Sequence, residues 1–277
     1  YIAPLSNVIR SFGINHHQYA DDTQLYITVL KDDVLSCVCR IESCINAVHK
    51  WLSQNWLSLN PKKSEAIQFT SGRGQSRVED IASIAVSGVR IKPSTVVKSL
   101  GVTLDGGLTF DQHIANVCKA SYFHIRALRH VRKSLPDDVA KTVACSIVGS
   151  RIDYCNALLV GMSDSNFAKL QRVQNTLACV VLVLRKFEHI TPALIELHWL
   201  PVKQRVTFKL ATLTMKTIHS GQPTYLRELV NAYEPVRTLR SSSQHLLCVG
   251  RTRTVTAARS FRHSSATIWN SLPAEIR

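Results

Sequence analysis

The pattern of apolar residues changes at Asp105-Gly106-Gly107, and this change constrains the fold more than any other feature of the chain. Before it, short alternating runs typical of β-strands surround one longer helical stretch. After Phe110, apolar residues recur at spacings of three and four, the period of an amphipathic helix. The sequence therefore predicts an α+β chain with a boundary at these glycines. We expect three parts: a first domain of strands and one helix at 1–110, a helical domain at 111–235 and a basic segment at 236–277.

Positive charge is concentrated in the second part of the chain. Of the formal net charge of +15, residues 1–110 carry +2 and residues 111–277 carry +13. Such a surplus favours a polyanionic partner, and nucleic acid is the commonest one for an intracellular chain. A solvated basic surface, or a ribosomal or anionic-membrane partner, is the alternative that composition leaves open. The longest aliphatic run, Leu177–Leu184, is too short to span a bilayer, so we expect no membrane association and a location in the cytoplasm or nucleus.

The eight cysteines form neither a CxxC pair nor a cluster with histidines at zinc spacing. We therefore expect no metal knuckle and no disulfide framework, and we interpret the cysteines as small buried apolar residues in a reducing compartment. The chain begins at Tyr1 without methionine and in mid-pattern, so we expect a fragment or a partial gene model.

Two adjacent acids mark the first part of the chain. Tyr19-Ala20-Asp21-Asp22 stands between an apolar helix that stops at Gly13 and a β-leaning run, Thr23–Val29, so we expect a tight turn there. Adjacent carboxylates at such a turn repel each other unless a hard cation lies between them. A solvated surface turn is the ordinary alternative. Because neighbouring side chains of a strand point to opposite faces, Asp21 is the expected direct metal ligand and Asp22 the supporting one.

Further elements follow from periodicity and capping. Asp32 and Asp33 are expected to cap a helix that ends before Pro61. Its expected apolar stripe comprises Val34, Cys37 or Val38, Ile41, Ile45, Val48 and Leu52. A strand is expected at 65–69, a polar loop at 72–76, and a hairpin turning at Ser87-Gly88. Helices are expected at 111–133, 137–149, 151–160, 165–185, 202–219 and 223–231, with a less regular tail beyond them.

Tyr-Ala-Asp-Asp followed by Thr-Gln-Leu-Tyr resembles the catalytic turn in the palm of reverse transcriptases, in particular those of LINE-type (non-LTR), jockey-like retrotransposons. Three later segments are similar to this family in the same order: 51–64, 97–105, and the tail from 238–243 through 269–277. The resemblance implies an incomplete palm of β-hairpins plus a helix, followed by a mostly α-helical thumb and C-terminal region. It also implies a fragment of an RNA-directed DNA polymerase. Its partners would be an RNA template, a DNA primer and, in the complete enzyme, deoxynucleoside triphosphates; protein partners are not implied.

The resemblance also assigns roles to single residues. Asp21 and Asp22 would hold Mg²⁺ or Mn²⁺ for two-metal nucleotidyl transfer, expected only in the complete enzyme, and Tyr19 would pack near the primer terminus. Lys63 matches a lysine that protonates or neutralises the departing pyrophosphate, with an exposed helix-end lysine as the equal alternative. Gly101 lies in the primer-grip-like segment, where nucleic-acid backbone could approach a residue without a side chain. A bulge in an ordinary strand is the other explanation.

The first helix of the second part carries a regular row of cations. Lys119, Arg126 and Lys133 are seven residues apart and share a face, Arg129 lies close to it, and Arg132 is on the same helix. That spacing is expected of a helix laid along phosphates, as in a polymerase thumb, and a solvated face is the alternative.

In the basic tail, base stacking by Phe261 or Trp269 is possible, but we favour core anchoring for both aromatic residues.

The family's other catalytic aspartate and its nucleotide-binding fingers lie upstream of the catalytic turn and would precede Tyr1. We therefore expect the isolated chain to have negligible polymerase activity. The alternative is a non-catalytic remnant of a transposable element that binds nucleic acid or protein. Ribonuclease H and endonuclease activities find no support, because no further acidic constellation follows residue 111.

Overall fold

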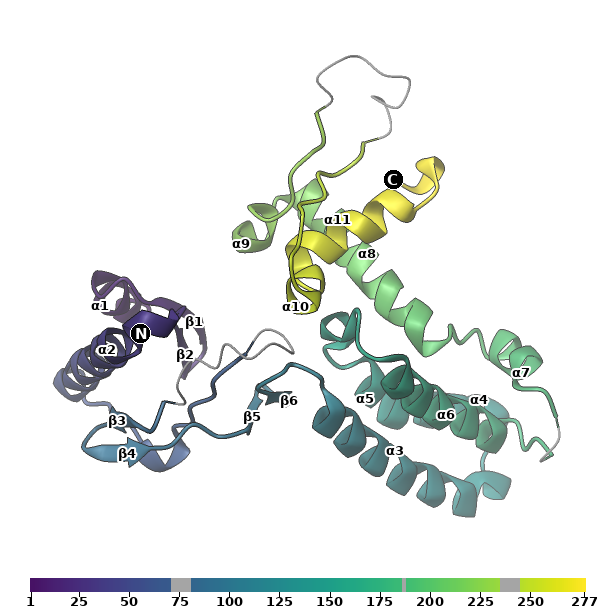
Figure 1. Ribbon diagram of the computed structural model, residues 1–277. Helices are drawn as coiled ribbons and strands as arrows, with labels where there is room; N and C mark the ends of the chain where they lie inside the picture. The colour runs from purple at the N-terminus through teal and green to yellow at the C-terminus, as the bar shows by residue number, and fades with distance from the viewer. Residues whose placement is uncertain (71–80, 186–187, 235–244) are drawn as a thin grey trace. The chain divides into compact units, whose positions relative to one another are not determined.

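The chain forms two units joined at a β-hairpin. A computed structural model describes residues 1–70, 81–185, 188–234 and 245–277 (Figure 1). Unit 1 comprises Tyr1–Ser99 with Asp105–Gly107, and unit 2 comprises Leu100–Leu104 with Leu108–Arg277. Named strands lie between residues 15 and 105, and every named element from residue 111 onward is a helix. The α+β class expected from the sequence is confirmed.

Unit 1 is built on two helices and a hairpin. Helix α1 (Leu5–Ser11) leads into strands β1 (Asn15–Tyr19) and β2 (Asp22–Tyr26), and α2 (Val34–Gln54) packs on α1. The two helices and Ile14, the residue directly before β1, form a small apolar core. Its other members are Leu5, Ile9, Cys44 and Val48. This core holds the hairpin by its inner face and leaves the outer face to solvent.

Two expectations for α2 need correction. Neither Asp33, the residue preceding the helix, nor Asp32 in the short 3₁₀ turn before it caps α2 through its side chain. The Asp33 carboxylate instead lies 3.5 Å from the Cys37 thiol. On the apolar stripe, Cys44 is fully buried whereas its neighbour Ile45 is only half-buried. The core therefore selects the residue one position earlier than the spacing indicated.

The remaining strands of unit 1 are short. Strands β3 (Ile84–Val86) and β4 (Val89–Ile91) form the expected antiparallel hairpin, in which Ser87 and Gly88 both adopt positive φ. The strand expected at 65–69 is wrong: only Ile67 forms a bridge, to Ser94. A run of alternating residues becomes a strand only where a partner strand pairs along its length. The loop expected at 72–76 lies outside the described residues.

The joining hairpin consists of β5 (Val96–Ser99) and β6 (Val102–Asp105). Leu100 and Gly101 form its two-residue turn, both with positive φ (45° and 83°). Two consecutive positive φ values match the right-handed twist of the flanking strands. This local turn requires a glycine at position 101.

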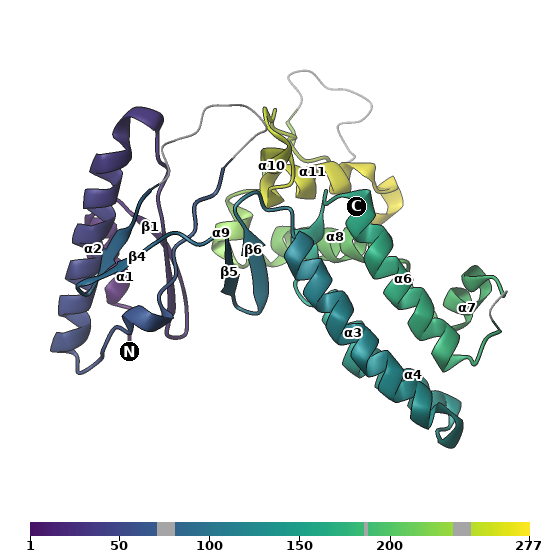
Figure 2. The ribbon, with the colours of Figure 1, turned by 60° about the horizontal axis from the view of Figure 1, so that its bottom comes forward.

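Unit 2 is a bundle of helices around a large apolar core. Figure 2 shows α3 (Asp111–Val131) and α6 (Asp164–Val181) running side by side, with α4 (Asp137–Ala144) beside them. Ser163 caps the start of α6, since its hydroxyl accepts from the amide of Asn166. Helix α8 (Val202–Ser220) ends at Gly221, which adopts φ 67°. These capping residues explain why the long helices begin and end close to the expected positions.

The shorter helices differ from expectation. The helix expected at 137–149 continues from α4 through a π-helical turn, Cys145–Gly149. The helix expected at 151–160 is two pieces, α5 (Ser150–Asp153) and a 3₁₀ turn, Asn156–Leu159, because Cys155 adopts positive φ and breaks it. The last expected helix shrinks to α9 (Thr224–Arg227), and α7 (Ile190–Glu196) was not expected.

The described C-terminal residues belong to unit 2, and they combine a stretch without helix at 245–254 with two helices, in line with the less regular tail that was expected. Helix α10 (Val255–Ala258) precedes α11 (Phe261–Ser271), which packs on α8. Trp269 is buried, and its indole N–H donates to the carbonyl of His245 at 2.9 Å. Core anchoring of Trp269 is thereby confirmed, and Phe261 packs half-buried against the same cluster.

Arg259 fastens this region to the start of the bundle. Its Nε donates to the carbonyl of Val160 at 3.1 Å, and its Nη1 donates to the carbonyl of Leu108 at 2.7 Å. The guanidinium lies over the ring of Phe110, 5.3 Å from its centroid. Gly161 makes room for the side chain, since a Cβ there would lie 2.7 Å from Cγ of Arg259.

Burial of the cysteines is less complete than expected. Cys37 and Cys44 are buried and Cys118 and Cys179 are half-buried, but four are exposed: Cys39, Cys145, Cys155 and Cys248. None of the helices in the described ranges is both long and apolar enough to cross a membrane.

Prediction for pH and stability. His113 of α3 is buried, and its Nδ1 accepts from the amide of Thr103 at 3.3 Å. Burial lowers the pKa of His113 below its usual 6.5. The unfolded chain therefore takes up the proton first, and the free energy of unfolding should fall as pH drops below about 6.5, by no more than about 1.4 kcal/mol per pH unit. Urea unfolding from pH 7.5 to 5 measures this slope.

His113→Asn is the matched variant, because an amide oxygen can replace Nδ1 as acceptor without titrating. We expect its unfolding free energy to depend less steeply on pH than that of the parent chain. Equal slopes would contradict a role for His113.

Candidate functional site

The acidic turn is the tip of the first hairpin of unit 1. Tyr19 pairs with Asp22 as the last partners of β1 and β2, and Ala20 and Asp21 form the two-residue turn between them. Ala20 adopts φ 52°. Asp21 and Asp22 are both exposed. The tight turn expected from the sequence is present, and it presents both carboxylates to solvent.

One face of this hairpin is exposed along its whole length. Alternate residues of both strands point outward, and cross-strand pairing puts Tyr19 beside Asp22 and His17 beside Gln24 on that face. Tyr19 is 69 % exposed. His17 stacks on Tyr26 with their ring centroids 5.3 Å apart. The outer face is therefore polar and aromatic and leads to the two acids at its end.

The two carboxylates offer an incomplete metal site. Among the residues that the structure describes, no group of three His, Cys, Asp or Glu side chains is placed to hold a metal ion. Oxygen donors suit Mg²⁺ or Mn²⁺, but Mg²⁺ requires six ligands in near-octahedral geometry. Asp21 and Asp22 fit such an ion as part of a ligand set that substrate phosphates, water or further carboxylates would complete.

Lys63 lies on a short 3₁₀ turn, Pro61–Lys63, and is exposed. Asn60 organises this turn, since its side-chain oxygen accepts from the amide of Lys62 at 3.0 Å. No hydrogen bond or ion pair joins Lys63 to the acidic turn within the described residues. The structure thus places Lys63 in the same unit as Asp21 but does not bring the two side chains into contact.

Gly101 faces protein rather than open space. A Cβ at this position would lie 3.2 Å from Cε1 of Tyr154, whose hydroxyl donates to the carbonyl of Leu100 at 2.6 Å. The absence of a side chain is explained by positive φ and by the Tyr154 ring. The alternative of a bulge is wrong, because Gly101 is a turn residue. Gly101 itself is exposed, and the approach of nucleic-acid backbone to it stays a prediction.

The cation row of α3 is exposed except at one position. Lys119, Arg126 and Arg129 lie on α3, and Lys133 lies on the 3₁₀ turn that follows it; all four are exposed. Arg132, by contrast, is 7 % exposed. Its Nε donates to the carbonyl of Val181 at 2.7 Å, its Nη1 to the carbonyl of Leu135 at 2.8 Å, and its Nη2 to Asp137. Arg132 therefore stabilises the packing of the bundle, and its guanidinium is not accessible to a phosphate.

Helix α6 adds two cations that the sequence reasoning missed. Burial raises the pKa of the Cys118 thiol on α3, and the positive charges of Lys169 and Arg172 on α6 partly oppose that rise. In the same way Arg129 of α3 acts on the thiol of Cys179 on α6, whose pKa burial also raises. These cations of α6 thus lie on a helix that packs directly on α3. Only the packing of α6 on α3 could have revealed this.

Part of the chain is similar in sequence to a known protein. A stretch of 103 residues, 37 % of the chain, is 28 % identical to "RNA-directed DNA polymerase from mobile element jockey" of Drosophila melanogaster. The chain is similar to a jockey-type retrotransposon protein. It spans only about a tenth of that relative's length. No protein-family model matches the chain, and no solved structure matches it either.

Prediction for Arg132 and Arg129. Arg132→Ala should lower the free energy of unfolding by about 2–4 kcal/mol, because it leaves the carbonyls of Val181 and Leu135 without their charged donor. Exposed Arg129 is the matched control, and its change to Ala should shift stability by less than about 0.5 kcal/mol. Urea denaturation measures both. Equal losses for the two variants would contradict the structural role of Arg132.

Proposed function

We propose that this chain is part of an RNA-directed DNA polymerase of a jockey-like retrotransposon, with the acidic turn at its catalytic centre. The observation that carries the proposal is the position of Asp21 at the tip of an exposed hairpin, with Asp22 beside Tyr19 on its outer face. The similarity to the Drosophila polymerase supports it independently. The 3′ end of a nucleic-acid primer can reach a carboxylate at a two-residue turn more easily than a side chain inside a β-sheet.

The chemistry fits the donors that the turn offers. Asp21 is the direct ligand of Mg²⁺ or Mn²⁺ in this proposal, and Asp22 is the supporting one. The bound ions would lower the pKa of the primer 3′-hydroxyl and offset negative charge as the phosphodiester bond forms. Tyr19 packs near the primer terminus from the exposed face it shares with Asp22.

Lys63 is assigned to the departing pyrophosphate. Its exposure leaves the ammonium group able to donate a proton or to neutralise charge there. It makes no contact with the acidic turn within the described residues, so this role requires that bound nucleotide bridge the two.

Unit 2 supplies the phosphate-binding surface. Lys119, Arg126, Arg129 and Lys133 are exposed, and their spacing along α3 follows one side of the helix. Arg172 is also exposed, on the helix α6 that packs on α3. The proposed partners are an RNA template and a DNA primer, and Lys and Arg side chains contact their phosphates without reading sequence. Deoxynucleoside triphosphates are substrates of the complete enzyme.

Prediction for nucleic-acid binding. The chain should bind an RNA·DNA duplex with an affinity that falls steeply with salt. Arg126→Gln with Arg129→Gln should reduce the slope of log K against log[salt] by about 1–2, since each phosphate contact contributes about 0.9. Fluorescence anisotropy between 50 and 300 mM salt measures the slope.

Lys209→Gln with Lys216→Gln is the control, because it removes two exposed charges of the same sign from α8. We expect this pair to change the slope less. A flat salt response of the parent chain, or equal effects of the two pairs, would refute the assigned surface.

Prediction for catalysis. In the complete polymerase that contains this chain, Asp21→Ala should reduce primer extension with Mg²⁺ or Mn²⁺ by at least about a hundredfold, because a metal ligand supplies several kcal/mol of transition-state stabilisation. Asp32→Ala removes an exposed acid of the same unit and should leave the rate nearly unchanged. The isolated chain should show negligible extension. Asp21-dependent extension by the isolated chain would contradict the inference that the ligand set is incomplete.

A non-catalytic nucleic-acid-binding protein, the remnant of a transposable element, is the second candidate. The observation that favours it is the ligand set itself: two acids without a third metal-binding side chain in the described residues. Duplex binding that persists in Asp21→Ala together with an inactive complete protein would select this function over the first.

A further inference from the structure

Unit 2 contains a cavity of about 210 Å³ that the proposed function does not use. Its lining comes from the π-helical turn after α4, from α5 and α6, and from Trp199 and the start of α8. Its walls include Cys145, Gly149, Asp153, Gln174, Trp199 and Arg205. This volume is below the roughly 300–1,000 Å³ of pockets that hold drug-sized ligands. It therefore suits one planar ring system rather than a whole nucleotide.

The π-helical turn opens one wall of this cavity. Cys145–Gly149 inserts an extra residue into the helical path, and such turns recur at functional sites. Gly149 is buried and contributes no side chain to the wall. Leu177 and Ile152 make other parts of the lining apolar, and Trp199 adds an aromatic ring that packs half-buried against the main core.

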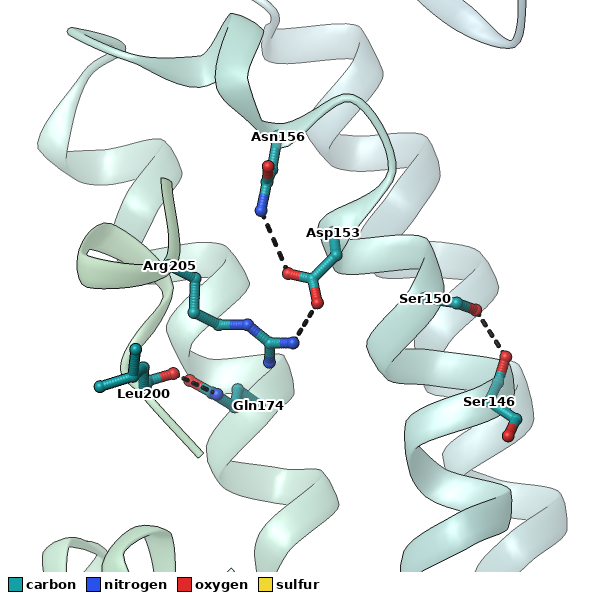
Figure 3. Close-up of polar contacts among 7 residues, drawn as sticks. All are labelled: Ser146, Ser150, Asp153, Asn156, Gln174, Leu200 and Arg205. Atoms are coloured by element: carbon teal, nitrogen blue, oxygen red, sulfur yellow. Dashed lines mark hydrogen bonds and ion pairs between the residues drawn. The ribbon is translucent and has the colours of Figure 1, made fainter. Parts of the chain in front are cut away.

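One side of the cavity carries a donor next to an acceptor. Arg205 reaches from α8 to the carboxylate of Asp153, and the Oδ1 of Asp153 also accepts from the Nδ2 of Asn156 at 3.2 Å (Figure 3). The two charged side chains remain 24 % and 35 % exposed. A guanidinium has five N–H donors, and Asp153 takes up one Nη of Arg205. Both groups therefore retain hydrogen-bonding capacity toward an occupant.

Gln174 is committed elsewhere. Its Nε2 donates to the carbonyl of Leu200 at 2.8 Å, and its Oε1 accepts from Gln171 at 3.0 Å. Ser150 also lines the cavity, and its hydroxyl donates to the carbonyl of Ser146. The charged groups that can recognise an occupant are Asp153 and Arg205.

We propose that this cavity binds a single unpaired nucleobase, turned out of a single-stranded segment. The proposal rests on nucleic-acid binding by unit 2, as set out above. The hydrogen-bonding edge of a base presents a donor next to an acceptor, which complements Asp153 and Arg205, while its faces suit apolar and aromatic walls. An apolar protein side chain would desolvate the two charged groups without replacing their water hydrogen bonds, which is unfavourable.

Cys145 provides a direct test in the unaltered chain, because it is exposed and lines the cavity. A single-stranded oligonucleotide should slow alkylation of Cys145 several-fold, measured residue by residue by mass spectrometry. Cys39 and Cys248 are also exposed and serve as internal references. A blunt duplex of the same length, and an abasic strand of the same charge, should leave the rate at Cys145 unchanged, since neither presents an unpaired base.

Gly149→Ala adds a methyl group to the lining of the cavity and so tests whether a base binds there. A Cβ there would lie 3.7 Å from the carbonyl oxygen of Ala144, an ordinary contact, so the variant should fold. We expect its affinity for the single strand to fall by between about fivefold and about a hundredfold, the range for loss of one stacked base, with duplex affinity unchanged. Ser146→Ala, an exposed position of the same π-helical turn, should change neither affinity. Arg205→Gln is a second variant that removes the charged donor and should act like Gly149→Ala.

The outcomes separate this inference from the proposed function. Salt-dependent duplex binding with no selective protection of Cys145 would overturn the nucleobase site and leave the phosphate-binding surface intact. Equal protection by duplex, abasic strand and single strand would also overturn it. Failure of the chain to bind any of the three polymers would overturn both.

Discussion

The apolar seam between α3 and α6 is the contact on which the rest of unit 2 depends. Ile114, Ile125 and Leu128 of α3 pack with the apolar row of α6 in one continuous core. Truncating one such buried side chain to alanine typically costs about 2–5 kcal/mol. Because this seam takes up the inner faces of both helices, their cations must point outward. The positive surface is thus a geometric result of core packing rather than a separate feature.

Unit 1 relies on a different balance. Its hairpin is held by a small apolar core on one side, and on the other side aromatic and polar groups lead to two carboxylates in water. Two neighbouring acids at a turn remain tolerable in isolation because solvent screens their repulsion. Bound nucleic acid or nucleotide would remove that screening, and a divalent cation would then offset both the acids and the phosphates.

Much of this arrangement could be predicted from the sequence, where a local rule decided it. The turns at Ala20-Asp21 and Ser87-Gly88 follow from turn chemistry, the extent of α3 follows from periodicity, and that of α8 follows from periodicity and from the glycine that ends it. The errors have long-range causes. Residues 65–69 found no partner strand along their length. Arg132, one position before an exposed lysine, turns inward because the carbonyl of Val181 lies 49 residues away in sequence but beside it in space.

Gly101 shows the same limit: a ring from Tyr154 fills the space that its missing side chain leaves. The cavity beside α5 was equally invisible, since its wall depends on a π-helical turn that no spacing rule indicates.

The clasp formed by Arg259 has a consequence for biosynthesis. It ties residue 259 to the carbonyls of Val160 and of Leu108, 151 positions earlier. During synthesis, the carbonyls of Leu108 and Val160 cannot form their hydrogen bonds with Arg259 until almost the whole of unit 2 has left the ribosome. A nascent bundle that is paused before that point lacks the Arg259 contacts, and we expect chaperones to bind such intermediates.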